Sequence, residues 1–121
     1  MSEEKYLKSL FDLSGKVACV TGASAGIGRT MAQSLARTGT SVVVTARRED
    51  LLAQTMDEIA SQGGKSNYVV AELNDVDKIP ELYEWVSEPF GPPDILVNAA
   101  GINLRENVEL TVVLPQNNYT P

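Results

Sequence analysis

The sequence contains no histidine and only one cysteine among its 121 residues. Without histidine the chain can form neither a Ser/His/Asp triad nor the histidine clusters that bind many metals. A lone cysteine excludes an intramolecular disulfide and a cysteine-based zinc site. Cys19 lies in the apolar run of residues 17–20, which favours a small buried side chain over a reactive thiol. We therefore expect no metal site.

Positive charge is also scarce, since ten Lys and Arg are set against sixteen Asp and Glu, for a net charge of −6. The longest basic run is the pair Arg47 and Arg48, so the chain lacks the electrostatic footprint of a protein that binds nucleic acid or an anionic membrane. No apolar run reaches the eighteen or so residues of a membrane span, and the acidic start with Glu3 and Glu4 leads into no signal-peptide segment. These absences predict a cytoplasmic protein with neither kind of partner.

Short β-prone runs alternate with stretches of helical periodicity. Continuous apolar runs rich in β-branched residues are typical of strands buried on both faces of a parallel sheet. Four such runs occur, at residues 16–21, 41–45, 67–73 and 95–98. Apolar residues three or four positions apart predict a helix between each pair of strands, and a further short helix is expected over residues 3–10.

This alternation predicts an α/β fold, a Rossmann-like parallel sheet with helices on both faces, truncated after about four strands in the order 3-2-1-4. The sheet changes its direction of growth between the first and fourth strands, so a ligand is expected at their carboxyl ends. We divide the chain into an N-terminal lead-in (1–15), a partial NAD(P)-binding domain (16–105) and an atypical C-terminal tail (106–121).

A glycine-rich turn follows the first strand directly and opens into the first helix. Its sequence is TGASAGIG over residues 21–28, and the residues expected to contact a cofactor are Gly22, Ser24, Gly26, Ile27 and Gly28. Glycine allows a tight turn, a close approach of the backbone to a pyrophosphate, and close packing of helix on strand. The helix N-terminus can then hold phosphate oxygens without a lysine. A tight loop with nothing bound is the alternative interpretation.

The spacing TGxxxGxG, the approach FDLSGKVACVTGASAGIG and the later VNAAG together resemble the short-chain dehydrogenase/reductase family. The resemblance covers about residues 10–105, which correspond to roughly the first half of a typical member. It implies a Rossmann-like domain that binds NAD or NADP and transfers hydride between a carbonyl or alcohol and the nicotinamide.

Two arginines follow the second strand, where an NAD site usually places an acidic residue on the ribose 2′-OH. Arg47 and Arg48 would instead grip the 2′-phosphate of NADP through charge-assisted hydrogen bonds, so NADP is favoured over NAD. In the family that the chain resembles, an arginine placed as Arg47 is typical of members that prefer NADP. The alternative is that both are solvated charges paired with Glu49 or Asp50.

The resemblance also implies two further cofactor contacts. Glu72 and Leu73 occupy the place where the family usually has Asp and an apolar residue against the adenine, so Glu for Asp is a departure. Asn98, Ala99 and Gly101 belong to a segment similar to the family's NNAG, which flanks the adenosine ribose. A purely structural role is the alternative for Asn98.

The family's catalytic Ser and Tyr-x-x-x-Lys pair are missing from these 121 residues, because no tyrosine is followed by lysine four positions later. A group with a tuned pKa must protonate the hydride acceptor, so no catalytic residue is predicted. The sequence favours a truncated, inactive NADP-type oxidoreductase. Two alternatives stay open: a non-catalytic dinucleotide-binding or interaction module, and half of an enzyme completed by another chain. The fourth strand is expected to be an open edge through which chains could associate.

Overall fold

The computed structural model describes residues 2–72, 76–99 and 111–113. Its centre is one sheet in the order β3-β2-β1-β4-β5. The strands are β1 (Val17–Thr21), β2 (Ser41–Ala46), β3 (Lys65–Val70), β4 (Ile95–Asn98) and β5 (Thr111–Val113). The pairs β1 with β2, β1 with β4 and β2 with β3 are parallel, which confirms the predicted order 3-2-1-4.

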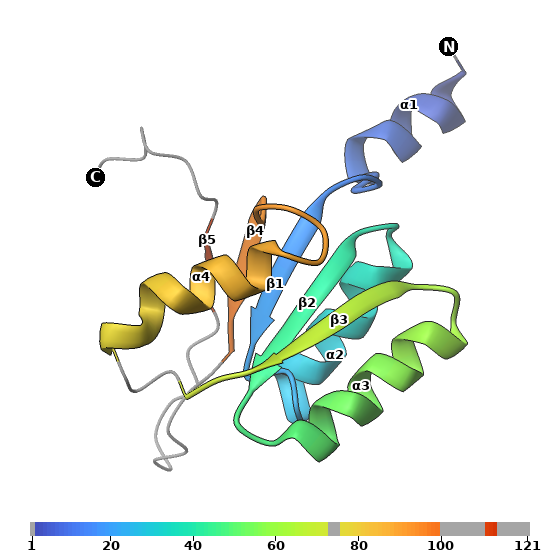
Figure 1. Cartoon of the computed structure of the whole chain (residues 1–121). Helices are drawn as coiled ribbons and strands as arrows, with labels where there is room; N and C mark the ends of the chain where they lie inside the picture. Colours follow the sequence, from blue (N-terminus) through green and yellow to red (C-terminus); the bar gives the residue numbers. More distant parts are fainter. Residues whose placement is uncertain (1, 73–75, 100–110, 114–121) are drawn as a thin grey trace.

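Helices cover both faces of the sheet, as predicted (Figure 1). α2 (Gly26–Arg37) and α3 (Glu49–Ser61) pack on one face, against buried side chains that include Val20, Val42 and Val44. The short 3-10 helix η1 (Val76–Lys78) leads into α4 (Ile79–Ser87), whose Val86 packs with Cys19 and Val43 on the other face. The alternation of side chains along a strand therefore supplies both cores.

The predicted open edge at β4 was wrong. β5 pairs antiparallel with β4, with Leu96 opposite Val113 and Asn98 opposite Thr111, so the sheet has a fifth strand. The unpaired N–H and C=O groups of an edge strand readily pair with a β-prone segment, and Thr-Val-Val is such a segment. Within the part of the chain that the structure describes, the edge on this side of the sheet belongs to β5.

Helix α1 (Glu3–Phe11) has Ser2 as its N-cap, and the Ser2 side chain accepts a hydrogen bond from the backbone N–H of Lys5. The helix extends away from the sheet, at the end opposite to the carboxyl ends of the parallel strands (Figure 1), and buries none of its residues. It confirms the short helix predicted there. The longest described helix, α3, has 13 residues, and none of the described helices is long and apolar enough to span a bilayer.

Cys19 lies within β1 and is 5% exposed, as predicted for a small buried side chain. Burial raises the pKa of its thiol to about 11. At about pH 8 only roughly one thiol in a thousand is then ionised, so we expect the native chain to resist a thiol reagent such as DTNB. The same chain in guanidinium chloride should react rapidly. Rapid reaction of the native chain would contradict the burial of Cys19.

Candidate functional site

The carboxyl ends of three strands meet at one edge of the sheet. β1 lies between β2 and β4, and Thr21, the last residue of β1, is in register with Thr45 on one side and Asn98 on the other. The segments that follow these strands therefore lie next to one another. This arrangement brings together the glycine-rich turn, the two arginines and the start of the VNAAG segment, as the sequence predicted.

The glycine-rich turn passes from β1 into α2 without a polar cap. Gly26, the first residue of α2, has a φ of 59°, a conformation that glycine adopts readily. Ala25 at the N-cap makes no side-chain hydrogen bond, and the first turn of α2 contains no acidic residue. A Cβ built on Gly26 meets no other atom within 4 Å, so the space beside this turn is open. The positive end of the helix dipole and its first N–H groups can thus receive an anion.

Gly28 permits the closest contact in the turn. A Cβ at this position would lie 2.2 Å from the carbonyl oxygen of Gly22 and 3.2 Å from the Cβ of Ala99. Only a residue without a side chain lets α2 approach β1 and β4 this closely. Gly28 is therefore needed for packing, whereas the exposed neighbour Ile27 (53% exposed) and the half-buried Ser24 lie nearer to solvent.

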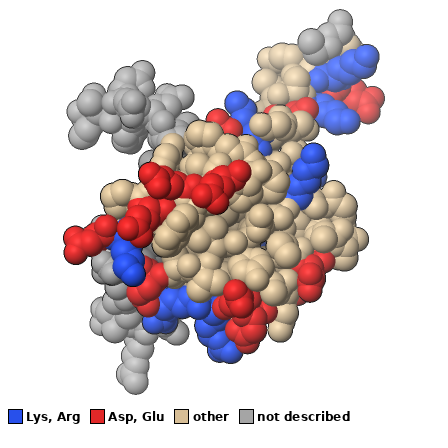
Figure 2. Space-filling model, viewed as in Figure 1, with Lys and Arg blue, Asp and Glu red and all other residues tan. Residues whose placement is uncertain are grey.

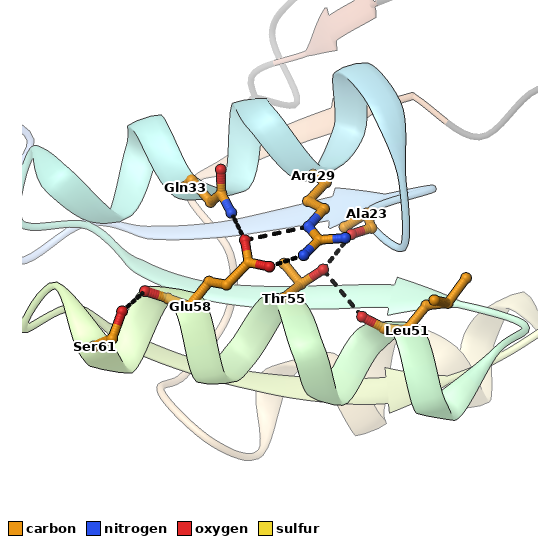
Figure 3. A network of polar contacts seen from close by, with 7 residues as sticks. All are labelled: Ala23, Arg29, Gln33, Leu51, Thr55, Glu58 and Ser61. Carbon is orange, nitrogen blue, oxygen red and sulfur yellow. Dashed lines mark hydrogen bonds and ion pairs between the residues drawn. The ribbon is translucent and has the colours of Figure 1, made fainter.

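Two other elements hold the turn in place. The N–H of Gly22 donates to the carbonyl oxygen of Thr45 at 2.9 Å, which ties the turn to β2. The hydroxyl of Thr55, in α3, lies 3.0 Å from the carbonyl oxygen of Ala23 and 3.2 Å from that of Leu51 (Figure 3). Thr55 is fully buried. The backbone of the turn is thus fixed from both the sheet and the neighbouring helix.

Sequence reasoning missed Thr55. Its place on the buried face of α3 could have been predicted, because Leu52, Thr55 and Ile59 recur at helical spacing and all three are buried. A threonine on such an apolar face needs a hydrogen-bond acceptor, and the partner here is the glycine-rich turn. That the acceptor would be Ala23 could not be read, because 32 residues separate the two in sequence.

We expect Thr55→Val to destabilise the fold by about 1 to 3 kcal/mol, because it leaves the buried carbonyl of Ala23 without this donor while keeping the side-chain shape. Urea unfolding of both chains measures the difference. The matched control is Thr30→Val on the exposed side of α2, which should change stability by less than about 0.5 kcal/mol. Equal effects of the two substitutions would contradict the role of Thr55.

A second polar group joins α2 to α3. Arg29, in the first turns of α2, forms an ion pair with Glu58 of α3, and Gln33 donates to the same carboxylate (Figure 3). The Arg29 side chain is 26% exposed and that of Glu58 42% exposed, so the pair is partly shielded from water. This network was not predicted. It fixes the relative position of the two helices that flank the turn.

Asn98 holds β4 to β1 through its side chain. The hydroxyl of Thr21 donates to Oδ1 of Asn98 at 2.7 Å, and the N–H of Ala99 donates to the carbonyl oxygen of Thr21 at 3.2 Å. These bonds extend the pairing of the two strands to the rim of the site. They show that Asn98 has a structural contact, and they place Ala99 beside the turn.

Each of the two arginines has a carboxylate partner. Nη1 of Arg47 lies 3.5 Å from Oε2 of Glu72, and Arg48 donates from Nη2 to Asp50 at 3.1 Å. The hydrogen bond from Arg48 lowers the pKa of Asp50. The pairing of Arg48 with Asp50 is the one that the solvated-charge alternative predicted. Figure 2 shows basic side chains beside acidic ones at this end of the sheet.

Two of the predicted contacts, Leu73 and Gly101, lie outside the described residues. Beside Glu72 the structure has a shallow cavity of about 240 Å³ between the end of β3 and α4, whose walls include Val70, Leu82 and Trp85. Among the described residues no cluster of three or more acidic or cysteine side chains could hold a metal ion.

The comparisons with known proteins fit this geometry. The model of the short chain dehydrogenase family matches residues 16–116. The chain belongs to the short chain dehydrogenase family. It is 40% identical over 100 residues to gluconate 5-dehydrogenase of Gluconobacter oxydans, a match that covers 83% of this chain and 39% of that enzyme.

Solved structures of the family have the same fold. A short-chain type dehydrogenase/reductase from Mycobacterium marinum is 40% identical, with a TM-score of 0.75 over 84% of this chain and 40% of the other. A metagenomic short-chain oxidoreductase in complex with NADP is 41% identical, with a TM-score of 0.71 over 75% of this chain and 41% of the other. The chain spans 29% to 43% of the length of four curated relatives.

Proposed function

We propose that this chain binds NADP and supplies the adenosine and pyrophosphate side of the cofactor site of a short-chain oxidoreductase. The observation that carries the proposal is the open, uncapped start of α2 at the point where the sheet changes its direction of growth. A pyrophosphate needs backbone N–H groups, a favourable dipole and no side chain in the way. The glycine-rich turn meets all three needs.

Arg47 supports NADP over NAD. Its side chain follows β2, is 73% exposed, and is positively charged where an NAD site would carry an acid. A planar guanidinium can bind a phosphate through two parallel hydrogen bonds. The NADP complex of the metagenomic relative shows that a member of this family takes that cofactor.

The other proposed contacts can be assigned to the parts of the cofactor in turn. The turn would hold the pyrophosphate through the backbone of Gly22, Ser24, Gly26, Ile27 and Gly28, and Arg48 would assist Arg47. Glu72 and Leu73 would lie near the adenine. The segment that contains Asn98, Ala99 and Gly101 would flank the adenosine ribose.

When bound, NADP supplies the hydride acceptor or donor for a carbonyl or alcohol. These 121 residues contain no Tyr-x-x-x-Lys pair, so we propose that this polypeptide by itself binds the dinucleotide without turnover. The proton transfer would need residues supplied beyond this sequence, in the same or another chain.

A thermal unfolding scan with NADP, NAD and ATP tests the proposal. A ligand that binds only the folded chain raises the unfolding midpoint by mass action, so we expect the largest rise with NADP, a smaller one with NAD and little with ATP. Equal rises with all three would indicate general anion binding. A cooperative transition that none of the three shifts would overturn the proposal.

A further inference from the structure

Arg47 and Glu72 come from neighbouring strands and meet where both strands end. Ala46 of β2 is in register with Val70 of β3, and the N–H of Ala71 donates to the carbonyl oxygen of Ala46 at 2.9 Å. The parallel pairing thus continues one residue beyond β3 and places the two side chains next to each other. Their closest charged atoms are 3.5 Å apart.

The pair differs from the other ion pair at this rim. Arg48 and Asp50 are two residues apart in sequence, and Asp50 lies in the first turn of α3, where the helix dipole also stabilises a carboxylate. That contact is local and would form wherever this helix starts. The contact of Arg47 with Glu72 exists only because the tertiary fold joins β2 to β3.

A carboxylate beside Arg47 acts on a 2′-phosphate in two ways. It competes for the same guanidinium, and its negative charge repels the incoming phosphate. Both side chains are partly in water, with exposures of 73% for Arg47 and 48% for Glu72, so the effect is modest and screened by salt. A dinucleotide with a free 2′-OH experiences neither penalty at this position.

We infer that Glu72 is a specificity-determining residue of the site. Its carboxylate pairs with Arg47 and repels the 2′-phosphate, so it lowers the affinity for NADP relative to that for NAD. This inference rests on the proposed function. It assigns to Glu72 an electrostatic role toward the 2′-phosphate that is separate from any contact with the adenine.

The test uses Glu72→Gln, which keeps the shape and a carbonyl oxygen but removes the charge. Calorimetric titration with adenosine 2′,5′-bisphosphate and with 5′-AMP, which differ only in the 2′-phosphate, isolates the adenosine side; NADP and NAD are then compared in the same way. We expect Glu72→Gln to tighten the two 2′-phosphorylated ligands by about two- to five-fold relative to 5′-AMP and NAD, because any change at the adenine is common to all four ligands. In an Arg47→Ala background, Glu72→Gln should increase the affinity for these ligands by less, because there is no guanidinium left for the carboxylate and the 2′-phosphate to compete for.

The matched control is Glu4→Gln in α1, an exposed carboxylate at the far end of the molecule. It removes the same charge from the chain and should change no affinity. Equal tightening by Glu4→Gln, or equal shifts for phosphorylated and unphosphorylated ligands with Glu72→Gln, would overturn the inference. If the unaltered chain binds none of the four ligands, the proposed function fails as well; if it binds NADP through Arg47 and Glu72→Gln has no effect, only the role of Glu72 is wrong.

Discussion

Gly28→Ala is expected to destabilise the chain by about 3 kcal/mol and to abolish dinucleotide binding. The added Cβ would lie 2.2 Å from the carbonyl oxygen of Gly22, which is backbone and cannot rotate away. Overpacking of a tight contact typically costs 1 to 3 kcal/mol, and here α2 would also have to move away from the turn that its N-terminus serves. Urea unfolding measures the first effect and calorimetry with NADP the second.

The matched control is Gly26→Ala, which adds the same methyl group two residues earlier. That Cβ meets nothing within 4 Å, so the cost arises only from the φ of 59° and should be about 1 to 2 kcal/mol. A Gly28→Ala chain as stable as the Gly26→Ala chain would contradict the close contact of α2 with β1. A Gly28→Ala chain as stable as the unaltered chain would contradict this contact still more strongly.

Arg47→Ala should weaken NADP far more than NAD, by about 1.5 to 3 kcal/mol, because a charge-assisted hydrogen bond to the 2′-phosphate is lost. This corresponds to roughly ten- to 150-fold in affinity. The folded state should hardly change, since the side chain is 73% exposed and its ion pair with Glu72 is a surface pair. Titration of both cofactors at one ionic strength measures the difference.

Arg37→Ala is the control for this prediction. Arg37 is exposed and lies in the last turn of α2, at the other end of the helix from the glycine-rich turn, so its loss removes the same charge away from the site. It should weaken both cofactors little and equally. An equal loss of NADP and NAD affinity in Arg47→Ala would remove Arg47 from the 2′-phosphate site.

Much of the framework could be predicted from local pattern alone. Runs such as residues 41–45 are β-branched and continuous, as is typical of buried parallel strands, and the predicted strand at 95–98 matches Ile95–Asn98. The glycine-rich turn could be predicted for the same reason, because its glycines lie close together in the sequence directly after a strand. These features could be recognised from residues within a few positions of one another along the chain.

The partners across the fold were decided only by the tertiary structure. Three examples are the carboxylate that pairs with Arg47, the carbonyl oxygen that accepts the hydrogen bond from Thr55, and the strand that pairs with β4. Each depends on a contact between segments that are distant in the sequence. Local propensity indicates that a residue is apolar, charged or β-prone, but it does not specify the neighbour that packing supplies. The sequence by itself therefore determined the family and indicated the candidate site, whereas the pairing of β2 with β3 decided that Glu72 lies next to Arg47.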